Sequence, residues 1–357
     1  MRSRLNHSNE KKSKGPALAL LAAALFGLST PLAKLLLDHL EPILLAALLY
    51  LGSGVGLTAW LIIRRSLHGP QEADLRRSDF WWLGCAILSG GIIGPILLLI
   101  GLRVTPASSA SLLLNLEGVF TAGLAWFTFK ENLDRRIALG MAAIVVGGVL
   151  LSWSGKPQVG IPWGPILVGG ACLAWGIDNN LTRKVSSGDP IQIAAAKGLI
   201  AGIVNLMIAL VLGAARPRVV TVGAAALLGF VSYGVSLSLF VLALRYIGTA
   251  RTAAYFSSAP FVGALLSLII FKDRLTIAFL TAAILMLIGI WLHLTERHEH
   301  EHVHEELEHE HRHSHDGHHQ HHDDPALLAQ THTHVHRHVR LRHSHPHYPD
   351  IHHRHDH

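Results

Sequence analysis

The residues best able to do chemistry fall into two groups: polar side chains set inside long apolar stretches, and a histidine-rich carboxyl-terminal segment. The first group centres on Glu117, in SLLLNLEGVF, and on Lys197, in QIAAAKGLIAG. The second begins at His298 and reads HEHEHVHEELEHEHRHSHDGHHQHH. Charged groups in apolar surroundings face a cavity or a partner, and imidazoles bind transition metals. The two groups therefore predict two different kinds of site.

Glu117 lies midway along Val104–Phe129 and is the only charged residue of that stretch. Placing a charge at the centre of a bilayer costs about 2.5–3.5 kcal/mol, so such a group needs a reason to be there. A carboxylate at this depth binds a cation or carries a coupling proton, or else it is a structural partner for a buried lysine. We expect Gly118 to leave room for a close backbone approach. Thr121 shares the face of Glu117 one helical turn on, and we place it with Asn115 in the same transport path.

Lys197 pairs with Glu117, binds an anionic group, or extends its long stem to the membrane interface; the sequence leaves these three open. A polar triplet, Asp178, Asn179 and Asn180, ends another apolar stretch in AWGIDNNLTRK. One interpretation makes it a helix interruption that lines the path, paired with a proline in an earlier span. In the other, the span ends near Asn179 and exposes the triplet to the cytoplasm.

These residues lie within ten long stretches that are nearly free of charge. Of the 357 residues, 50% are hydrophobic and 15% charged, against about 25% charged in a soluble domain. About 20 apolar residues cross the hydrocarbon core, so we predict an all-α integral membrane protein with ten transmembrane helices. The stretches are Pro16–Ala33, Pro42–Ile63, Trp81–Leu102, Val104–Phe129, Ile137–Gly155, Pro157–Leu181, Pro190–Ala215, Val219–Leu244, Thr252–Phe271 and Leu275–Thr295.

Basic residues predict the orientation of the chain. Five of the first 15 residues are Lys or Arg, and further basic residues follow in the loops at 64–77 and 130–136. With ten spans these segments share one side of the membrane, and loops rich in Lys and Arg stay in the cytoplasm. We therefore expect both termini in the cytoplasm and the protein in a bacterial inner or plasma membrane.

An internal repeat explains why this bias fades in the second half. The segment GLRVTPASSASLLLNLEGVFTAGLAWFTFKENL, from Gly101, aligns without a gap on ALRYIGTARTAAYFSSAPFVGALLSLIIFKDRL, from Ala243, at a shift of 142 residues. Earlier, Phe26–Gly27 aligns with Trp175–Gly176. Five spans per repeat invert the second copy, which is a transporter architecture with its site between the halves. We predict a basic amino terminus at 1–15, five-helix repeats at 16–155 and 156–295, and a tail at 296–357.

Residues 16–295 resemble the EamA-type members of the drug/metabolite transporter superfamily. Ten spans in two repeats carry the resemblance, together with the acid-x-Leu element after the fourth and ninth spans, Glu131 to Leu133 and Asp273 to Leu275. The chain departs from the family pattern where Gly118 replaces a proline that is kept at Pro260. The resemblance implies a secondary carrier, usually an exporter of small metabolites or drugs, that does not hydrolyse ATP.

The tail is predicted to be a disordered cytoplasmic extension. It holds 23 of the 27 histidines from His298 onward, and few residues that could form a core. Neutral imidazole suits Zn, Ni, Cu and Co, and the interleaved pattern favours several exchangeable weak sites over one structural site. The alternative is a polyelectrolyte that becomes cationic near pH 6. The candidate ligands are His298, His300, His302, His304, His309, His311, His313, His315, His318, His319, His321 and His322.

Three functions remain open at this point. The first is an exporter of a divalent transition metal, with the tail collecting ions. The second is a carrier of a small organic metabolite or drug, with the tail as a metal or pH regulator. The third is a membrane-anchored metal sensor or store. We expect no enzymatic activity, no required cofactor and no nucleic-acid partner; the expected partners are the lipid bilayer, the cargo, a coupling proton and a second copy in a homodimer.

Overall fold

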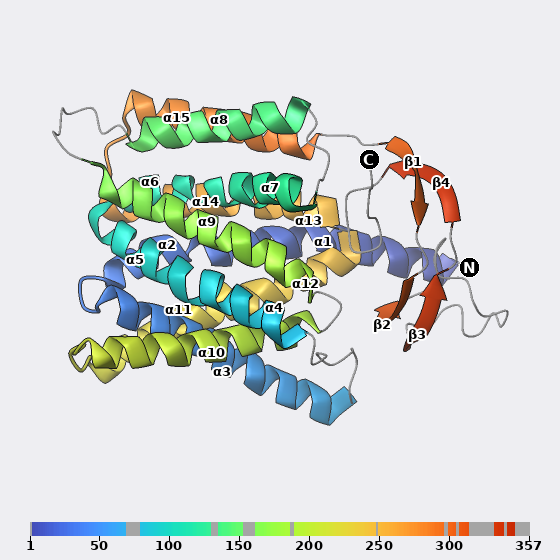
Figure 1. The fold of residues 1–357 in the computed structure, drawn as a ribbon, viewed down its shortest axis with the longest axis horizontal. Helices are drawn as coiled ribbons and strands as arrows, with labels where there is room; N and C mark the ends of the chain where they lie inside the picture. Colours follow the sequence, from blue (N-terminus) through green and yellow to red (C-terminus); the bar gives the residue numbers. More distant parts are fainter. Residues whose placement is uncertain are drawn as a thin grey trace.

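The computed structural model describes residues 2–68, 79–129, 135–152, 161–185, 189–247, 249–295, 299–304, 307–313, 332–338 and 341–346. Up to Leu294 the described chain is a bundle of helices (Figure 1). They are α1 (Arg2–Gly27), α2 (Ser29–Leu36), α3 (Pro42–His68), α4 (Asp79–Ala86), η1 (Ile87–Ile93), α5 (Gly94–Val104), α6 (Ala107–Leu113), α7 (Leu116–Phe129), α8 (Arg135–Ser152), α9 (Trp163–Arg183), α10 (Pro190–Val211), α11 (Val219–Gly229), η2 (Phe230–Val235), α12 (Ser236–Ile247), α13 (Thr249–Phe256), α14 (Ala259–Phe271) and α15 (Ile277–Leu294).

Seven segments of the described chain are long and apolar enough to cross a membrane. They are Gly15–Leu36, Pro42–Leu67, Asp79–Val104, Ala107–Thr128, Arg135–Ser152, Pro190–Val211 and Val219–Ala243, with shorter apolar helices at Ala259–Phe271 and Ile277–Leu292. The helix α9 is long enough to span, but it carries the polar triplet at 178–180. The ten predicted stretches thus all coincide with helical segments, while the count of ten crossings stays a prediction.

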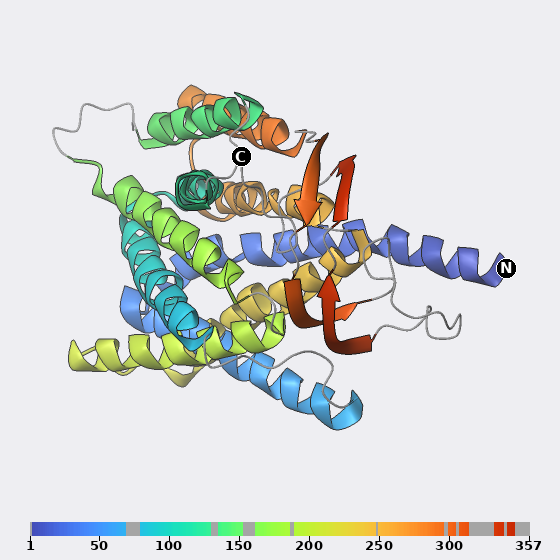
Figure 2. The ribbon, with the colours of Figure 1, turned by 45° about the vertical axis from the view of Figure 1, so that its right-hand side comes forward.

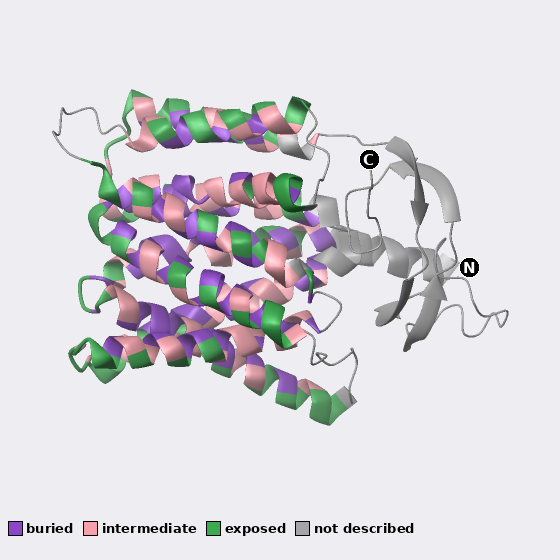
Figure 3. Ribbon diagram, in the orientation of Figure 1, coloured by how far each residue is buried: buried purple, intermediate pink, exposed green. Residues whose placement is uncertain are grey.

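Large apolar side chains cover the outer faces of the bundle, where exposed residues alternate with buried ones along each helix (Figure 3). Examples that are exposed are Trp60, Ile62, Phe127, Val146 and Ile269. A surface of this kind suits hydrocarbon and would be a severe liability in water. The chain is therefore an integral membrane protein.

Helices from the first half of the chain pack against helices from the second half, and most of these contacts occur in corresponding pairs. The helix α3 packs on α10, and α8 lies beside α15 along one flank in both views (Figures 1 and 2). The contact of α1 with α12 has its counterpart in that of α5 with α9, and α7 on α9 has its counterpart in α14 on α1. Each of these pairs joins a helix of residues 16–155 to one of residues 156–295.

Two π-helical segments interrupt the third and eighth predicted spans at matching positions. Shifting η1 (Ile87–Ile93) by the repeat length of 142 gives 229–235, which overlaps η2 (Phe230–Val235). The fourth and ninth spans are broken too, between α6 and α7 and between α13 and α14. A π turn widens the helix and shifts backbone carbonyls out of the regular ladder, and such turns occur frequently at functional sites.

Close backbone contacts hold α3 against α10. A Cβ added at Gly198 would lie 2.7 Å from the Cα atom of Gly54, so the two helices touch through their main chains. Such contacts are typical of small residues at membrane helix interfaces. The largest apolar cluster is built from the end of α2, the start of α3, the end of α5 and the first turns of α9. It fills the half of the bundle that lies away from the first residues of α1 (Figure 1).

Of the two interpretations of the triplet, the helix interruption is wrong, because α9 continues through residues 178–180 to Arg183. Its proposed mate behaves differently, since α1 ends at Gly27 and α2 begins at Ser29. The triplet stays helical because its polar side chains have partners within reach. The Asn180 amide, for example, donates to the carbonyl of Gly176 one turn back, at 2.8 Å.

The prediction of a wholly disordered tail differs from the structure, which has β1 (Glu299–His304), β2 (Leu307–His313), β3 (His332–His338) and β4 (Leu341–Pro346). The strands form two antiparallel pairs, β1 with β4 and β2 with β3 (Figure 1). The alternation of histidine with other residues has the period of a strand, which disorder from composition alone does not capture. The register sets His300 opposite His345, and His311 opposite His334. His298, His315, His318, His319, His321 and His322 lie outside the described residues.

Candidate functional site

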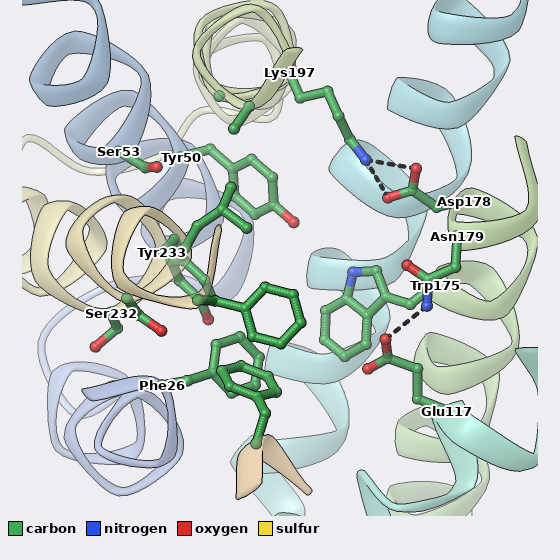
Figure 4. A pocket seen from close by; sticks show the side chains of 16 residues that line it. Phe26, Tyr50, Ser53, Glu117, Trp175, Asp178, Asn179, Lys197, Ser232 and Tyr233 are labelled. Atoms are coloured by element: carbon green, nitrogen blue, oxygen red, sulfur yellow. Dashed lines mark hydrogen bonds and ion pairs between the residues drawn. The ribbon is translucent and has the colours of Figure 1, made fainter. Parts of the chain in front are cut away.

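A cavity of about 320 Å³ lies between the two halves of the bundle. Its walls come from α1, α3, α7, α9, α10, η2, α12 and α13, so most of the central helices contribute (Figure 4). Three charged side chains, those of Glu117, Asp178 and Lys197, reach it. The other half of the bundle is filled by the large apolar cluster, which includes the ends of α2 and α5.

One side of the cavity is aromatic. Tyr50 and Tyr233 stack with ring centroids 5.9 Å apart, and Phe26 meets Tyr233 edge-on at 5.8 Å. Phe256 continues the series, at 5.4 Å from Phe26 and 4.8 Å from Phe240. The sixth aromatic ring, that of Trp175, lies across from these beside the charged groups (Figure 4). The cavity therefore offers π faces opposite charge.

Lys197 and Asp178 form a closed ion pair at the other side. The Lys197 ammonium donates to both Asp178 oxygens, at 2.6 and 2.7 Å, and to Thr182 Oγ1 at 3.2 Å. The hydroxyl of Thr182 in turn donates to Asp178 Oδ1 at 2.8 Å. Lys197 thus pairs with Asp178 rather than with Glu117, and its stem does not run to the interface. Asp178 sits one helical turn before Thr182 on α9, which is why both reach the same cation.

Glu117 opens α7 and faces α9. The Asn179 amide donates to Glu117 Oε1 at 2.9 Å and to Thr121 Oγ1 at 3.2 Å. Asn180 fixes the same interface by donating to the Thr121 carbonyl at 3.0 Å. The predicted group of Glu117, Thr121, Asn179 and Asn180 is therefore brought together by one helix contact. Of these four, Glu117 and Asn179 line the cavity.

The π-helical segment η1 supports the site from behind. The Gly90 carbonyl accepts hydrogen bonds from the Tyr50 hydroxyl and from the Trp175 indole, both at 2.9 Å. A Cβ added at Gly90 would overlap the Asp178 carboxylate, and one at Gly94 would lie 2.8 Å from Trp175 Nε1. Only glycine lets the backbone come this close to α9. The widened turn thus positions two cavity rings and the carboxylate that holds Lys197.

The second π-helical segment, η2, contributes Ser232 and Tyr233 to the cavity wall. The Ser232 side chain is buried, and among the described residues its Oγ has no hydrogen-bond partner. A buried hydroxyl without a partner carries a desolvation cost of about 1–3 kcal/mol. This hydroxyl is available to a polar group that enters the cavity.

Two predicted residues do not take the roles expected of them. The Asn115 amide donates to the Leu112 carbonyl at 2.9 Å and contacts Met286 Sδ at 3.7 Å, away from the cavity. Gly118 is exposed, and a Cβ there would have nothing within 4 Å, so it permits no close approach. That role falls to Gly176, where an added Cβ would lie 2.9 Å from Phe120.

The rings of the aromatic wall are not among the site residues predicted from the sequence. Aromatic residues in apolar helices look like any other lipid-facing or core residue, so composition does not single them out. One signal was present in the repeat: Phe26 and Trp175 occupy equivalent positions before a glycine, and both line the cavity. Asn205 of α10 forms an interhelical hydrogen bond, from its amide to the Gly91 carbonyl of η1 at 3.0 Å.

Polar contacts also join helices near the two ends of the bundle. At one end the Arg64 guanidinium pairs with Asp189, which caps α10 by accepting from the amide of Ile191 at 2.9 Å. At the other end the Lys34 ammonium donates to the carbonyls of Leu102, Arg103 and Thr105, at 2.5, 3.0 and 3.1 Å. A cation at the carboxyl end of α5 satisfies carbonyls that have no partner within the helix.

The described residues hold no group of three or more His, Cys, Asp or Glu side chains that could bind a metal ion. A polar and aromatic cavity between helices with lipid-facing outer surfaces is the arrangement expected of a membrane transporter. The model of the EamA-like transporter family matches the chain twice, over residues 13–153 and 162–295. The chain belongs to the EamA-like transporter family.

Individual proteins give the same result. The chain is 30% identical to an uncharacterized transporter of Methanothermobacter thermautotrophicus, over 76% of this chain and 84% of the relative. It is 26% identical to a probable amino-acid metabolite efflux pump of Salmonella typhimurium, over 77% and 93%. A solved crystal structure that is 18% identical matches with a TM-score of 0.57 and covers 79% of this chain and 96% of its own, which shows a shared fold.

Proposed function

We propose that the chain is a secondary-active exporter of a small organic solute, which binds in the cavity between the two halves. The observation that carries this proposal is the pairing of a charged wall with an aromatic one in a single cavity of about 320 Å³. That volume lies at the lower end of the range of small-molecule sites. The name of the Salmonella relative, an efflux pump for amino-acid metabolites, supports export as the direction.

A divalent metal ion as cargo has less support from the cavity. Of its two carboxylates, Asp178 is taken up by Lys197 and Thr182, which leaves Glu117 as the one acidic group without a cation. A site that competes with water for Zn²⁺ or Ni²⁺ needs three or four ligands of His, Cys or carboxylate type. The organic solute is therefore the better fit, and a sensor or store that moves nothing fits the family poorly.

Orientation, coupling and assembly complete the proposal. The basic loops support termini in the cytoplasm of a bacterial inner or plasma membrane. A proton that binds Glu117, which lines the cavity, in exchange for the solute would supply the driving force. Exchange at a single carboxylate needs no cofactor. A homodimer is compatible with the exposed apolar side chains on α8 and α15, such as Val146 and Ile284.

We propose further that the histidine-rich tail binds divalent transition-metal ions and regulates the carrier. Opposed residues of an antiparallel pair share one face, with Cβ atoms about 4.5–5.5 Å apart. The register places His300 opposite His345 and His302 opposite His343 along β1 and β4. Imidazoles at this spacing suit Ni²⁺, Cu²⁺ and Zn²⁺.

Export is tested by mass spectrometry of the medium around cells that produce the chain. We expect at least one small organic solute to accumulate several-fold faster than in cells with an empty vector. Ala194 lines the cavity, so Ala194→Trp should abolish this accumulation by filling it, while Ala59→Trp on an exposed face of α3 should not. Equal solute concentrations in the media of cells with the wild type and with the Ala194→Trp variant would refute export through this cavity.

The tail is tested separately with purified protein and a version that ends at Thr295. Titration calorimetry with NiCl₂ or ZnCl₂ should give binding to the full chain and little to the shorter one. Export by the shorter chain should persist but lose its response to added metal. Identical titrations of both proteins would eliminate the tail as a metal site.

A further inference from the structure

The charges that line the cavity do not balance. Asp178 and Lys197 neutralise each other, whereas Glu117 meets an amide and a hydroxyl network rather than a cation. With Glu117 ionised, the cavity carries one net negative charge. An uncompensated carboxylate in such surroundings favours a positive charge close by.

Lys197 cannot serve as the anchor for an anionic solute in this arrangement. An ammonium group has three N–H donors, and those of Lys197 are directed at Asp178 Oδ1, Asp178 Oδ2 and Thr182 Oγ1. A carboxylate on the solute would have to displace that of Asp178 and leave it without a partner. The cavity therefore discriminates against anions and against the carboxylate of a zwitterion.

Glu117 by contrast has acceptor capacity to spare. An ionised carboxylate accepts about four hydrogen bonds, and among the described residues the recorded donor to Glu117 is Asn179, at Oε1. Its other oxygen, Oε2, points toward the open space between the two walls (Figure 4). An ammonium group placed there would gain a charge-assisted hydrogen bond.

The aromatic wall fits the rest of such a molecule. The rings of Tyr50, Tyr233 and Phe26 form a continuous series across from Glu117 (Figure 4). The ring of Phe256 extends this series, with its centroid 5.4 Å from that of Phe26. Their faces are attractive to a cation within about 6 Å and to an apolar or aromatic body in stacked or edge-on contact. A hydrated metal ion would gain nothing from this surface.

Resting on the proposed function, we propose that the solute is a small organic monoamine. Its ammonium group binds Glu117, and its apolar or aromatic body lies against the series of rings. Glu117 and Phe256 then determine specificity, one through charge and the other through its π face. Anions, uncharged isosteres and amino-acid zwitterions of the same size are poorer ligands.

Calorimetry on the purified full-length protein tests this with four probes of similar size. They are 2-phenylethylamine, uncharged 2-phenylethanol, the anion 3-phenylpropionate and the zwitterion L-phenylalanine. We expect the amine to bind at least tenfold more tightly than the other three. Equal or tighter binding of 3-phenylpropionate or L-phenylalanine, or no binding of the amine, would overturn the assignment.

Two variants separate the charge from the fold. Glu117→Gln keeps an acceptor for Asn179 and should weaken amine binding at least tenfold, to the level of the alcohol. Glu41→Gln removes an exposed carboxylate just before α3 and should change nothing. Where Glu117→Gln fails to fold, Phe256→Leu should weaken amine binding several-fold while Phe256→Tyr keeps it. An amine affinity that is unchanged by both Glu117→Gln and Phe256→Leu would contradict the proposal.

The failure of this assignment is distinguishable from failure of the proposed function. The test is counterflow of 3-phenylpropionate and of L-phenylalanine. If either compound shows counterflow and Ala194→Trp blocks it, the chain is a carrier but is not selective for amines. Counterflow that persists unchanged in Ala194→Trp would instead remove the cavity from the path.

Discussion

Lys197 donates to both carboxylate oxygens of Asp178, at 2.6 and 2.7 Å, across the interface between α10 and α9. Both side chains are largely buried, with 18% and 9% of their surfaces exposed. A buried pair contributes little net stability compared with apolar residues, but loss of one partner leaves a buried charge alone. The main energetic effect of the pair is therefore the loss of stability that follows when one of its two charges is removed.

Asp178→Asn should lower the free energy of unfolding by about 3 kcal/mol, because Lys197 keeps its charge without a counter-ion. The double variant with Lys197→Met removes both charges and should recover at least half of this loss. Denaturant titration in mixed micelles measures the three proteins. A double variant as unstable as the single one would contradict this account.

Asp178→Asn should also change what the cavity binds. The Lys197 ammonium becomes free to hold an anion, and the net charge of the cavity rises from minus one to zero. We expect the affinity for 3-phenylpropionate to rise about tenfold, equivalent to about 1.4 kcal/mol, as measured by calorimetry on monodisperse protein. Unchanged anion affinity would show that Lys197 is held in place by something other than Asp178.

Gly90→Ala should disturb the site through shape alone. The added methyl group overlaps the Asp178 carboxylate, so the pair with Lys197 must shift; overpacking of this kind costs about 1–3 kcal/mol. Gly84→Ala is the matched control, since a Cβ there meets nothing within 4 Å and alanine favours a helix by up to about 1 kcal/mol. Thermal unfolding should separate the two in opposite directions, and equal midpoints would refute the steric argument.

Lys34→Met should destabilise the end of the bundle that carries the large apolar cluster. Three carbonyls at the end of α5 lose their donor, at a cost of about 1–2 kcal/mol for charge-assisted bonds in a partly exposed place. Arg216→Gln removes an exposed charge from the loop after α10 and serves as the control. Thermal unfolding midpoints check this, and equal values for the two variants would count against it.

The charged residues of this site could be predicted from the sequence, because charged side chains are rare in its long apolar stretches. Glu117, Asp178 and Lys197 were identified because each is the lone charge of its stretch, and all three reach one cavity. The partner of Lys197 was not predictable, because either carboxylate satisfied the same rule. Only the folded arrangement of α9 and α10 brings the carboxylate of Asp178, rather than that of Glu117, within reach of the Lys197 ammonium.

The parts that escaped prediction have physical causes. The aromatic wall uses the same residues that face lipid elsewhere, as Trp60 and Phe127 do. The π turns have no composition of their own, since η1 reads ILSGGII and η2 reads FVSYGV. A break at the triplet in α9 was one of two open interpretations of its polar residues, yet here Thr182, Lys197 and the Gly176 carbonyl satisfy them within a continuous helix.

The matching π turns extend the internal repeat beyond residue identity. The two segments, 87–93 and 230–235, read differently, yet the same shift of 142 residues that aligns the sequence repeat maps the first onto the second. The first supports the charged side of the cavity from behind, and the second places Ser232 and Tyr233 in its wall. In the part of the chain that the structure describes, each half of the bundle therefore brings one widened turn to the same cavity.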